Sequence, residues 1–274
     1  MIRSLYSGVS GMKGFQTKLD VIGNNIANVN TIGYKQSRVM FSDILSQTVT
    51  GVTAPQDSDR GGANAKQIGL GVSVASIETL HTPGSAMTTN VVTDLRIDGD
   101  GFFAVKATAD QEVPYLTRAG NFTLDGNRNL VTAEGFLVCD SAGDPITLGD
   151  DVTAFMIGKG GEIISVDAEG NQTSDGALKI GVVKIVNPSG LSKLGNNLYS
   201  VTPNANPDGT FEVGEANDPT TGTGAIISGQ LEMSNVDLTS EFTEMIVAQR
   251  GFQANSRIIT TSDSILEEVV NLKR

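Results

Sequence analysis

The sequence predicts an α+β protein in which helices at the two ends of the chain flank a β-rich middle. Two observations support this fold class. Apolar residues recur with sustained helical spacing only near the termini, and the middle shows short β-prone runs separated by turn residues. The chain has 274 residues, of which 32 are glycine, and this length suggests one large domain or two modest ones.

The N-terminal helix is predicted from apolar residues separated by alternating gaps of three and four. These residues are Met12, Phe15, Leu19, Ile22, Ile26 and Val29. Four glycines interrupt the same segment, namely Gly8, Gly11, Gly14 and Gly23. Each costs up to ~1 kcal/mol relative to alanine inside a helix. An isolated helix of this kind is marginal in water, so we expect it to need a packing partner.

The middle of the chain is predicted to form many short strands. Asp125-Gly126 lies between two β-prone runs within residues 122–131, which predicts a hairpin. Further strands are predicted at residues 163–166 and 180–186. Short strands with Gly-rich turns are typical of a sandwich or barrel-like domain.

The C-terminal helix is predicted from a strict seven-residue repeat. Its members are Leu238, Met245, Phe252, Ile259 and Leu266. The positions four residues later are apolar only at the two ends of the series: Phe242, Gln249, Ser256, Asp263 and Val270. We therefore expect the helix to bury its stripe against something larger. The polar run at 234–237 supplies helix-initiating side chains. The alternative is that the two terminal helices form an ordinary pair within one chain and do not need further copies.

These patterns predict a discontinuous domain organisation. Residues 1–34 and 232–274 are expected to form a helical terminal domain, and residues 72–231 a β-rich domain. Residues 35–71 are expected to be an extended connector, flexible over 46–66, where Gly, Thr, Ala and Asp predominate.

Composition excludes several classes of protein. The single cysteine, Cys139, and the single histidine, His81, cannot supply a disulfide framework or a tetrahedral zinc site. The net charge of −12 argues against nucleic-acid binding, although residues 1–38 carry five basic residues and one acidic residue. No stretch approaches the ~18 consecutive apolar residues of a transmembrane helix, and no cleavable signal peptide is visible.

The segments that could carry chemistry lack essential residues. The runs starting at Asp98 and Asp125 begin like calcium loops but lack later ligands. Residues 158–161 lack the flanking residues of a phosphate-binding loop, and no Gly-x-Ser-x-Gly elbow is present. We therefore expect no enzyme, no catalytic residues, no cofactor and no metal.

Longer motifs resemble the flagellar axial proteins of bacteria, which include rod, hook and hook-associated proteins. The resemblance is carried by residues 24–35, 98–105, 117–125, 135–138, 186–191, 195–199, 234–238 and 245–255. Within these segments the motif positions that we single out are Asn24, Asn25, Asn28, Gly33, Tyr34, Gln249, Arg250 and Asn255.

The resemblance implies a homopolymeric tube in which the terminal helices pair as a coiled-coil layer around a channel, with the β-rich domain outside. The side chains expected to hold this layer together are Leu5, Met12, Leu19, Ile22, Ile26, Leu238, Phe242, Met245, Phe252, Ile259, Leu266 and Val270. The expected partners are further copies, other axial proteins (rod, hook cap and hook–filament junction) and the flagellar export apparatus. The resemblance implies an extracellular location in the flagellum after export without a cleaved signal, with no membrane insertion.

Two members of the family fit a chain of this length. The segment 255–274 and the Asp237-Leu238 pair look more like the hook protein, so the expected function is a curved tube that transmits torque as a universal joint and conducts exported subunits. The alternative is the distal rod protein, a drive shaft, because the Gly-rich segment 46–71 matches the insertion that distinguishes the rod. A more remote alternative, a β-rich adhesin or carbohydrate-binding module, would need an exposed aromatic platform, and the chain has no Trp.

Overall fold

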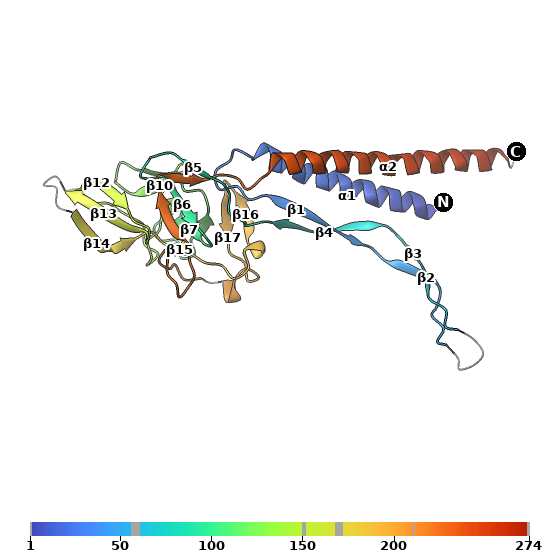
Figure 1. Ribbon diagram of the computed structural model, residues 1–274, viewed down its shortest axis with the longest axis horizontal. Helices are drawn as coiled ribbons and strands as arrows, with labels where there is room; N and C mark the ends of the chain where they lie inside the picture. Colours follow the sequence, from blue (N-terminus) through green and yellow to red (C-terminus); the bar gives the residue numbers. More distant parts are fainter. Residues whose placement is uncertain (1, 56–60, 150–151, 168–171, 210, 273–274) are drawn as a thin grey trace. The chain divides into compact units, whose positions relative to one another are not determined.

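The structure, a computed structural model, describes residues 2–55, 61–149, 152–167, 172–209 and 211–272. It is α+β, with one helix at each end of the chain and strands between them (Figure 1). The predicted helices are confirmed as α1 (Ile2–Ala27) and α2 (Leu238–Asn271). None of the helices in the described part of the chain is sufficiently long and apolar to cross a membrane.

The chain divides into two compact units. The helical unit comprises Met1–Ala27, Ser37–Thr79 and Asp237–Arg274, and the β unit comprises Asn28–Gln36 and Leu80–Val236. This partition differs from the expected boundaries at residues 34, 71 and 231. Which segments fold independently stays a prediction.

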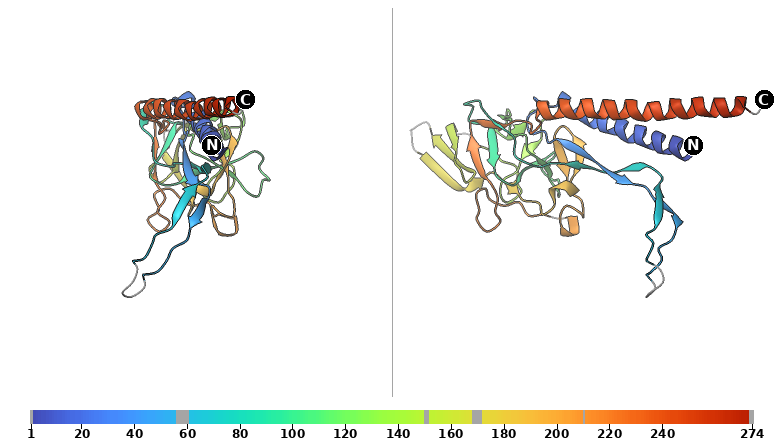
Figure 2. Two further views of the ribbon diagram at one scale, coloured as in Figure 1. Left: turned by 90° about the vertical axis from the view of Figure 1, so that its right-hand side faces the viewer. Right: turned by 45° about the vertical axis from the view of Figure 1, so that its right-hand side comes forward.

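In the helical unit the two helices run antiparallel, side by side in both views of Figure 2. Gly8, near the start of α1, lies against Ile259, whereas Phe15 lies against Gly251, which is earlier in α2. Asp237 caps the N-terminus of α2, because its carboxylate accepts a hydrogen bond from the Thr239 backbone N–H at 3.0 Å. The helix-initiating role predicted for the run 234–237 is confirmed at this residue.

The expected connector at 35–71 is instead most of a paired β-hairpin. Strand β1 (Ser37–Asp43) pairs with β4 (Val72–Thr79), and β2 (Ser46–Thr50) pairs with β3 (Lys66–Gly69), all antiparallel. Backbone hydrogen bonds between Ile44 and Gly71 and between Leu70 and Leu45 continue the ladder across the join. Both faces of β2 and β3 are exposed, so these strands show no alternation of buried and exposed residues. Whether residues 46–66 are flexible stays a prediction.

The β unit is built on one eight-stranded antiparallel sheet. Its order is β16 (Ser192–Gly195), β17 (Leu198–Ser200), β8 (Tyr115–Thr117), β7 (Phe102–Lys106), β11 (Leu137–Val138), β10 (Leu130–Thr132) and β9 (Phe122–Leu124), with β15 (Val182–Val183) also paired to β7. The predicted hairpin at 122–131 is confirmed as β9–β10. Its left-handed turn residue is Arg128, at φ 61°.

Smaller antiparallel groups complete the β unit. They are β12 (Val152–Ile157), β13 (Glu162–Asp167) and β14 (Gln172–Lys179); β6 (Leu95–Asp98) with β18 (Ala225–Ser228); and β5 (Ala86–Thr88) with β19 (Gln230–Glu232). Two 3₁₀ turns lie at Pro188–Gly190 and Pro207–Gly209. The described strands close no barrel, so that part of the fold expectation is not supported.

Strand β7 lies at the centre of the core, and all five of its residues are buried. Phe103 and Val105 belong to one hydrophobic cluster, whereas Phe102 and Ala104 belong to a second. Because neighbouring residues of a strand point to opposite faces, this strand is covered on both sides. The motif at 98–105 therefore encodes the central strand of the β unit.

Candidate assembly interface

The buried positions of the two helices are mostly small or polar. They are Gly8, Gly11, Gly14, Ile22 and Asn25 on α1, and Glu241, Ala248 and Ser262 on α2. A Cβ built on Gly11 would lie 2.7 Å from the Asn255 amide nitrogen, and one on Gly14 would lie 2.9 Å from the Phe41 ring. These glycines weaken the isolated helix but permit close approach of its neighbours.

The contact between the helices uses companion positions that the sequence pattern did not suggest. The buried residues of α2 lie three residues after members of the seven-residue repeat, as Ala248 does after Met245, and not four residues after. Positions four residues later, such as Phe242 and Val270, are 50% and 64% exposed. The three-residue companions are small or polar, so they add nothing to the apolar periodicity by which a buried helix face is predicted from sequence.

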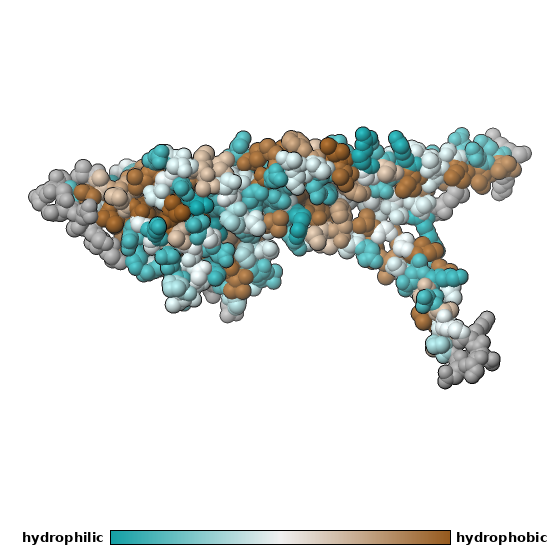
Figure 3. Space-filling model, in the orientation of Figure 1, coloured by the Kyte–Doolittle hydropathy of each residue, from teal (hydrophilic) through white to brown (hydrophobic). Residues whose placement is uncertain are grey.

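The large apolar residues expected to hold the inner layer together fall into three classes within one chain. Ile22 is buried, and the half-buried members are Leu5, Met12, Leu19, Ile26, Met245, Ile259 and Leu266. The exposed members are Leu238, Phe242, Phe252 and Val270. Further exposed apolar residues on the helices are Tyr6, Val9, Ile246, Val247, Ile258, Ile265, Val269 and Leu272. Figure 3 shows hydrophobic residues along the visible face of α2, so the helix pair leaves much apolar surface uncovered.

The motif positions on the helices have different environments. Asn24, Gln249 and Arg250 are exposed, and the Arg250 guanidinium donates to the Gln253 side chain at 3.1 Å. Asn255 is half-buried over Gly11. Asn25 is buried.

The rest of the N-terminal motif fastens residues 28–36 to the β unit. The Thr31 hydroxyl and backbone N–H donate to the Asn28 side chain and carbonyl, both at 3.1 Å. Gly33 adopts φ 69°, and its N–H donates to the Glu232 carbonyl at 2.8 Å. Tyr34 is buried, with the Lys193 ammonium 5.1 Å from its ring centroid.

A buried ionic cluster, formed by Lys35, Arg118 and Glu232, lies beside this motif. The Glu232 carboxylate accepts from Lys35 at 2.6 Å and from Arg118 at 3.2 Å, and all three side chains are at most 3% exposed. Burial alone would raise the pKa of Glu232, but the charges of Arg118 and Lys35 outweigh it and lower that pKa. The cluster joins three distant segments of the β unit.

Two residues considered for chemistry prove to be packed side chains. His81 lies in the loop after β4, against the rings of Phe102 and Tyr199 at 5.5 Å each. Burial, aided by nearby Lys and Arg charges, lowers the pKa of His81 to about 4, so its ring is neutral at pH 7. Cys139 is fully buried, and burial raises the pKa of its thiol to about 11.

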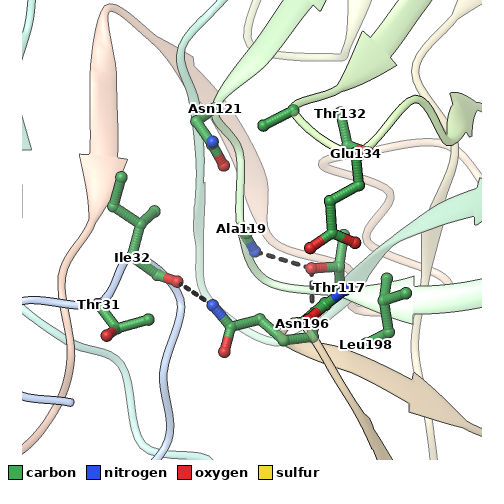
Figure 4. Close-up of a pocket in the computed structure, with 11 residues that line it drawn as sticks. Thr31, Ile32, Thr117, Ala119, Asn121, Thr132, Glu134, Asn196 and Leu198 are labelled. Atoms are coloured by element: carbon green, nitrogen blue, oxygen red, sulfur yellow. Dashed lines mark hydrogen bonds between the residues drawn. The ribbon is translucent and has the colours of Figure 1, made fainter. Parts of the chain in front are cut away.

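A pocket of about 240 Å³ lies in the β unit beside the N-terminal motif (Figure 4). Asn197 anchors one wall, because its side-chain amide donates to the Ile32 carbonyl at 2.8 Å and its backbone carbonyl accepts from the Thr117 hydroxyl at 3.0 Å. The lining is otherwise neutral apart from Glu134. The described residues contain no group of three or more potential metal ligands.

The two ends of the chain and part of its middle match known protein families. Residues 5–35 match the family described as "Flagella basal body rod protein", and residues 96–165 match "Flagellar hook protein FlgE/F/G D1 domain". Residues 227–272 match "Flagellar basal body rod FlgEFG protein C-terminal". The chain is also 56% identical over 275 residues, and over the full length of both chains, to "Flagellar basal-body rod protein FlgG" of Bacillus subtilis. The chain belongs to the flagellar rod and hook protein family.

Other members of this flagellar family match with lower identity. "Flagellar basal-body rod protein FlgG" of Borreliella burgdorferi is 36% identical over 278 residues, with both chains fully covered. "Flagellar hook protein FlgE" of the same organism is 29% identical over an alignment of 452 residues that spans both chains. These relatives are structural proteins, so the chain is a structural component of the flagellar axis. The expectation of a hook protein is not confirmed, because the relatives support its alternative better.

Proposed function

We propose that this chain is a distal rod subunit of the bacterial flagellum, which polymerises into a hollow drive shaft. The observation that carries the proposal is the full-length match to a rod protein at 56% identity over 275 residues. The alignment with the Borreliella hook protein extends to 452 residues, so that hook protein carries sequence that this chain lacks. Length and identity thus favour the rod.

The sequence features that suggested a hook have a structural explanation common to both proteins. Asp237 caps α2, and Asn255 packs over Gly11 between the two helices. Because these residues cap α2 and pack the helix pair within one chain, they do not discriminate a hook from a rod.

The terminal helices are proposed to form the inner layer of the shaft, paired as a coiled coil and packed against other copies. The exposed apolar residues of α2 support this role. Packing against other copies would remove them from water, at a gain of roughly 1.5–3 kcal/mol for each fully buried side chain. The ordering entropy of assembly offsets part of that gain. Many such contacts are therefore needed in each subunit.

The β1–β4 and β2–β3 hairpin is proposed as a second subunit contact. Isolated two-stranded hairpins are at best marginally stable in water. Ile44, Leu45, Val49 and Val52 are between 51% and 72% exposed on this hairpin. Packing against neighbouring copies would cover them and resist sliding between subunits, as a stiff shaft requires. This segment coincides with the region matched to the rod's insertion.

The remaining partners follow from the same proposal. The chain would leave the cell through the flagellar export apparatus and would then contact other axial proteins at the two ends of its segment of the shaft. Its channel would conduct later subunits. The −12 net charge and the absence of a helix able to cross a membrane in the described residues fit neither nucleic-acid binding nor membrane insertion.

Replacing Val270 with aspartate is expected to abolish assembly without unfolding the chain. Val270 is 64% exposed in a single chain, so the charge costs the monomer little. In the proposed inner layer the same carboxylate would be buried without a partner, at a cost of several kcal/mol per subunit. Cells carrying V270D should make the protein but lack swimming motility and complete basal bodies under electron microscopy.

The matched control is Asn271→Asp, which places the same charge on the adjacent exposed and already polar residue. This variant should swim. Normal basal bodies in V270D cells would contradict the assignment of α2 to the inner layer.

A further inference from the structure

The surface where α1 and α2 meet is lined largely by small residues. Gly8, Gly11 and Gly14 recur at three-residue spacing on α1, and the facing positions of α2 include Ala248 and Gly251. Phe15 of α1 projects over Gly251 of α2, and Asn255 of α2 projects over Gly11 of α1, so packing contributes to the register.

Asn25 supplies a buried polar anchor at the end of α1. Asn25 is only 1% exposed. The amide nitrogen donates to the Ser37 carbonyl at 2.8 Å, and the amide oxygen accepts from the Ser37 N–H at 3.0 Å. This two-bond clamp fixes the last turn of α1 to the first residue of β1.

The same amide nitrogen reaches α2. It donates to Oε1 of Glu241 at 3.3 Å, and Glu241 is only 6% exposed. The other carboxylate oxygen, Oε2, is buried with no hydrogen-bond partner among the described residues. A carboxylate placed in this way is a poor source of stability, because burial penalises its charged form. Its position calls for a different explanation.

We propose that, beside this packing, the Asn25–Glu241 hydrogen bond is needed to set the register of α2 on α1. In the observed register the carboxylate has a donor, and in a register slipped by one turn it would be buried with none. A single buried polar group specifies register in paired helices by this kind of penalty on the alternatives. The nearby Lys18–Glu244 ion pair has a half-exposed carboxylate and a long, flexible cation, so it tolerates a slip.

Distances between spin labels in the full-length chain test the proposal. Cys139, the single cysteine, is replaced by alanine, and nitroxides are attached through cysteines at Lys13 and Glu267, two exposed positions on opposite helices. Because these sites are several turns apart along the axis, a one-turn slip changes the distance by up to about 5 Å. The parent chain and Glu241→Gln, which keeps an oxygen acceptor, should both give one distance population. Glu241→Leu should add a displaced population at unchanged helix content.

A second pair of variants separates register from simple loss of stability. Asn25→Asp removes the donor and sets two carboxylates against each other, so it should also produce the displaced population. Adding Glu241→Gln should restore the single distance, because the new amide can donate to the carboxylate introduced at position 25 in the reversed sense. An unshifted distance in both Glu241→Leu and Asn25→Asp, or a failure of the double variant to restore the parent distance, would overturn the proposal.

Discussion

Replacing Glu232 with glutamine is expected to lower the free energy of unfolding of the β unit by about 3–5 kcal/mol. The carboxylate accepts from Lys35 at 2.6 Å, from the Gly84 N–H at 3.0 Å and from Arg118 at 3.2 Å. Glutamine keeps the shape but removes the charge, which leaves two buried cations without their counter-charge. Breaking a buried ion pair on one side costs more than the pair contributes, because the remaining charge stays desolvated.

Urea unfolding followed by tyrosine fluorescence measures this loss. The chain has no Trp, and three of its four tyrosines lie in the β unit: Tyr34, Tyr115 and Tyr199. The matched control is Glu215→Gln, which breaks the Lys179–Glu215 pair at 2.7 Å, where the Glu215 side chain is 53% exposed. That change should cost no more than about 1 kcal/mol. Equal unfolding midpoints for the two variants would contradict the assigned role of the buried cluster.

Replacing Gly33 with alanine is expected to destabilise the β unit by about 3 kcal/mol or more. Gly33 has φ 69°, a conformation that side-chain-bearing residues rarely adopt. An added Cβ would also lie 2.6 Å from the backbone nitrogen of Ala119 and 2.8 Å from the carbonyl carbon of Arg118. Both contacts are with backbone atoms, so relief requires movement of the chain. The same urea titration measures the effect.

Gly23→Ala is the matched control, with an expected effect of opposite sign. Gly23 lies in the interior of α1, is exposed, and has no atom within 4 Å of an added Cβ. Alanine should therefore stabilise α1 by up to ~1 kcal/mol, seen as a gain in helical circular dichroism or in thermal midpoint. If both alanine variants behaved alike, the positive φ and close approach at Gly33 would not explain its place in the motif.

The sequence predicted those elements whose signals are local. The seven-residue repeat and the Asp237 cap located α2, and Asp125-Gly126 located the β9–β10 hairpin. In each case a few neighbouring residues determine the backbone conformation. The family motifs also predicted the functional class, because they resemble those of the flagellar axial proteins.

The contacts within each unit could not be predicted in the same way. Lys35 and Glu232 are 197 positions apart, and nothing local to either residue reveals the partner. The glycines of α1 have no side chain, so they do not contribute to an apolar pattern. Glu241 is charged, so its burial could not be predicted from the sequence. Residues 35–71 were predicted as a connector because β2 and β3 have no buried face to produce alternation, and β1 buries only Val39.

Electron microscopy of basal bodies from cells that lack this chain tests the proposed function most directly. A distal rod subunit is needed before any hook can form, so we predict truncated rods without hooks, and full-length rods with hooks when the chain is restored. Complete rods that lack only the hook would contradict the account and would assign the chain to the hook instead.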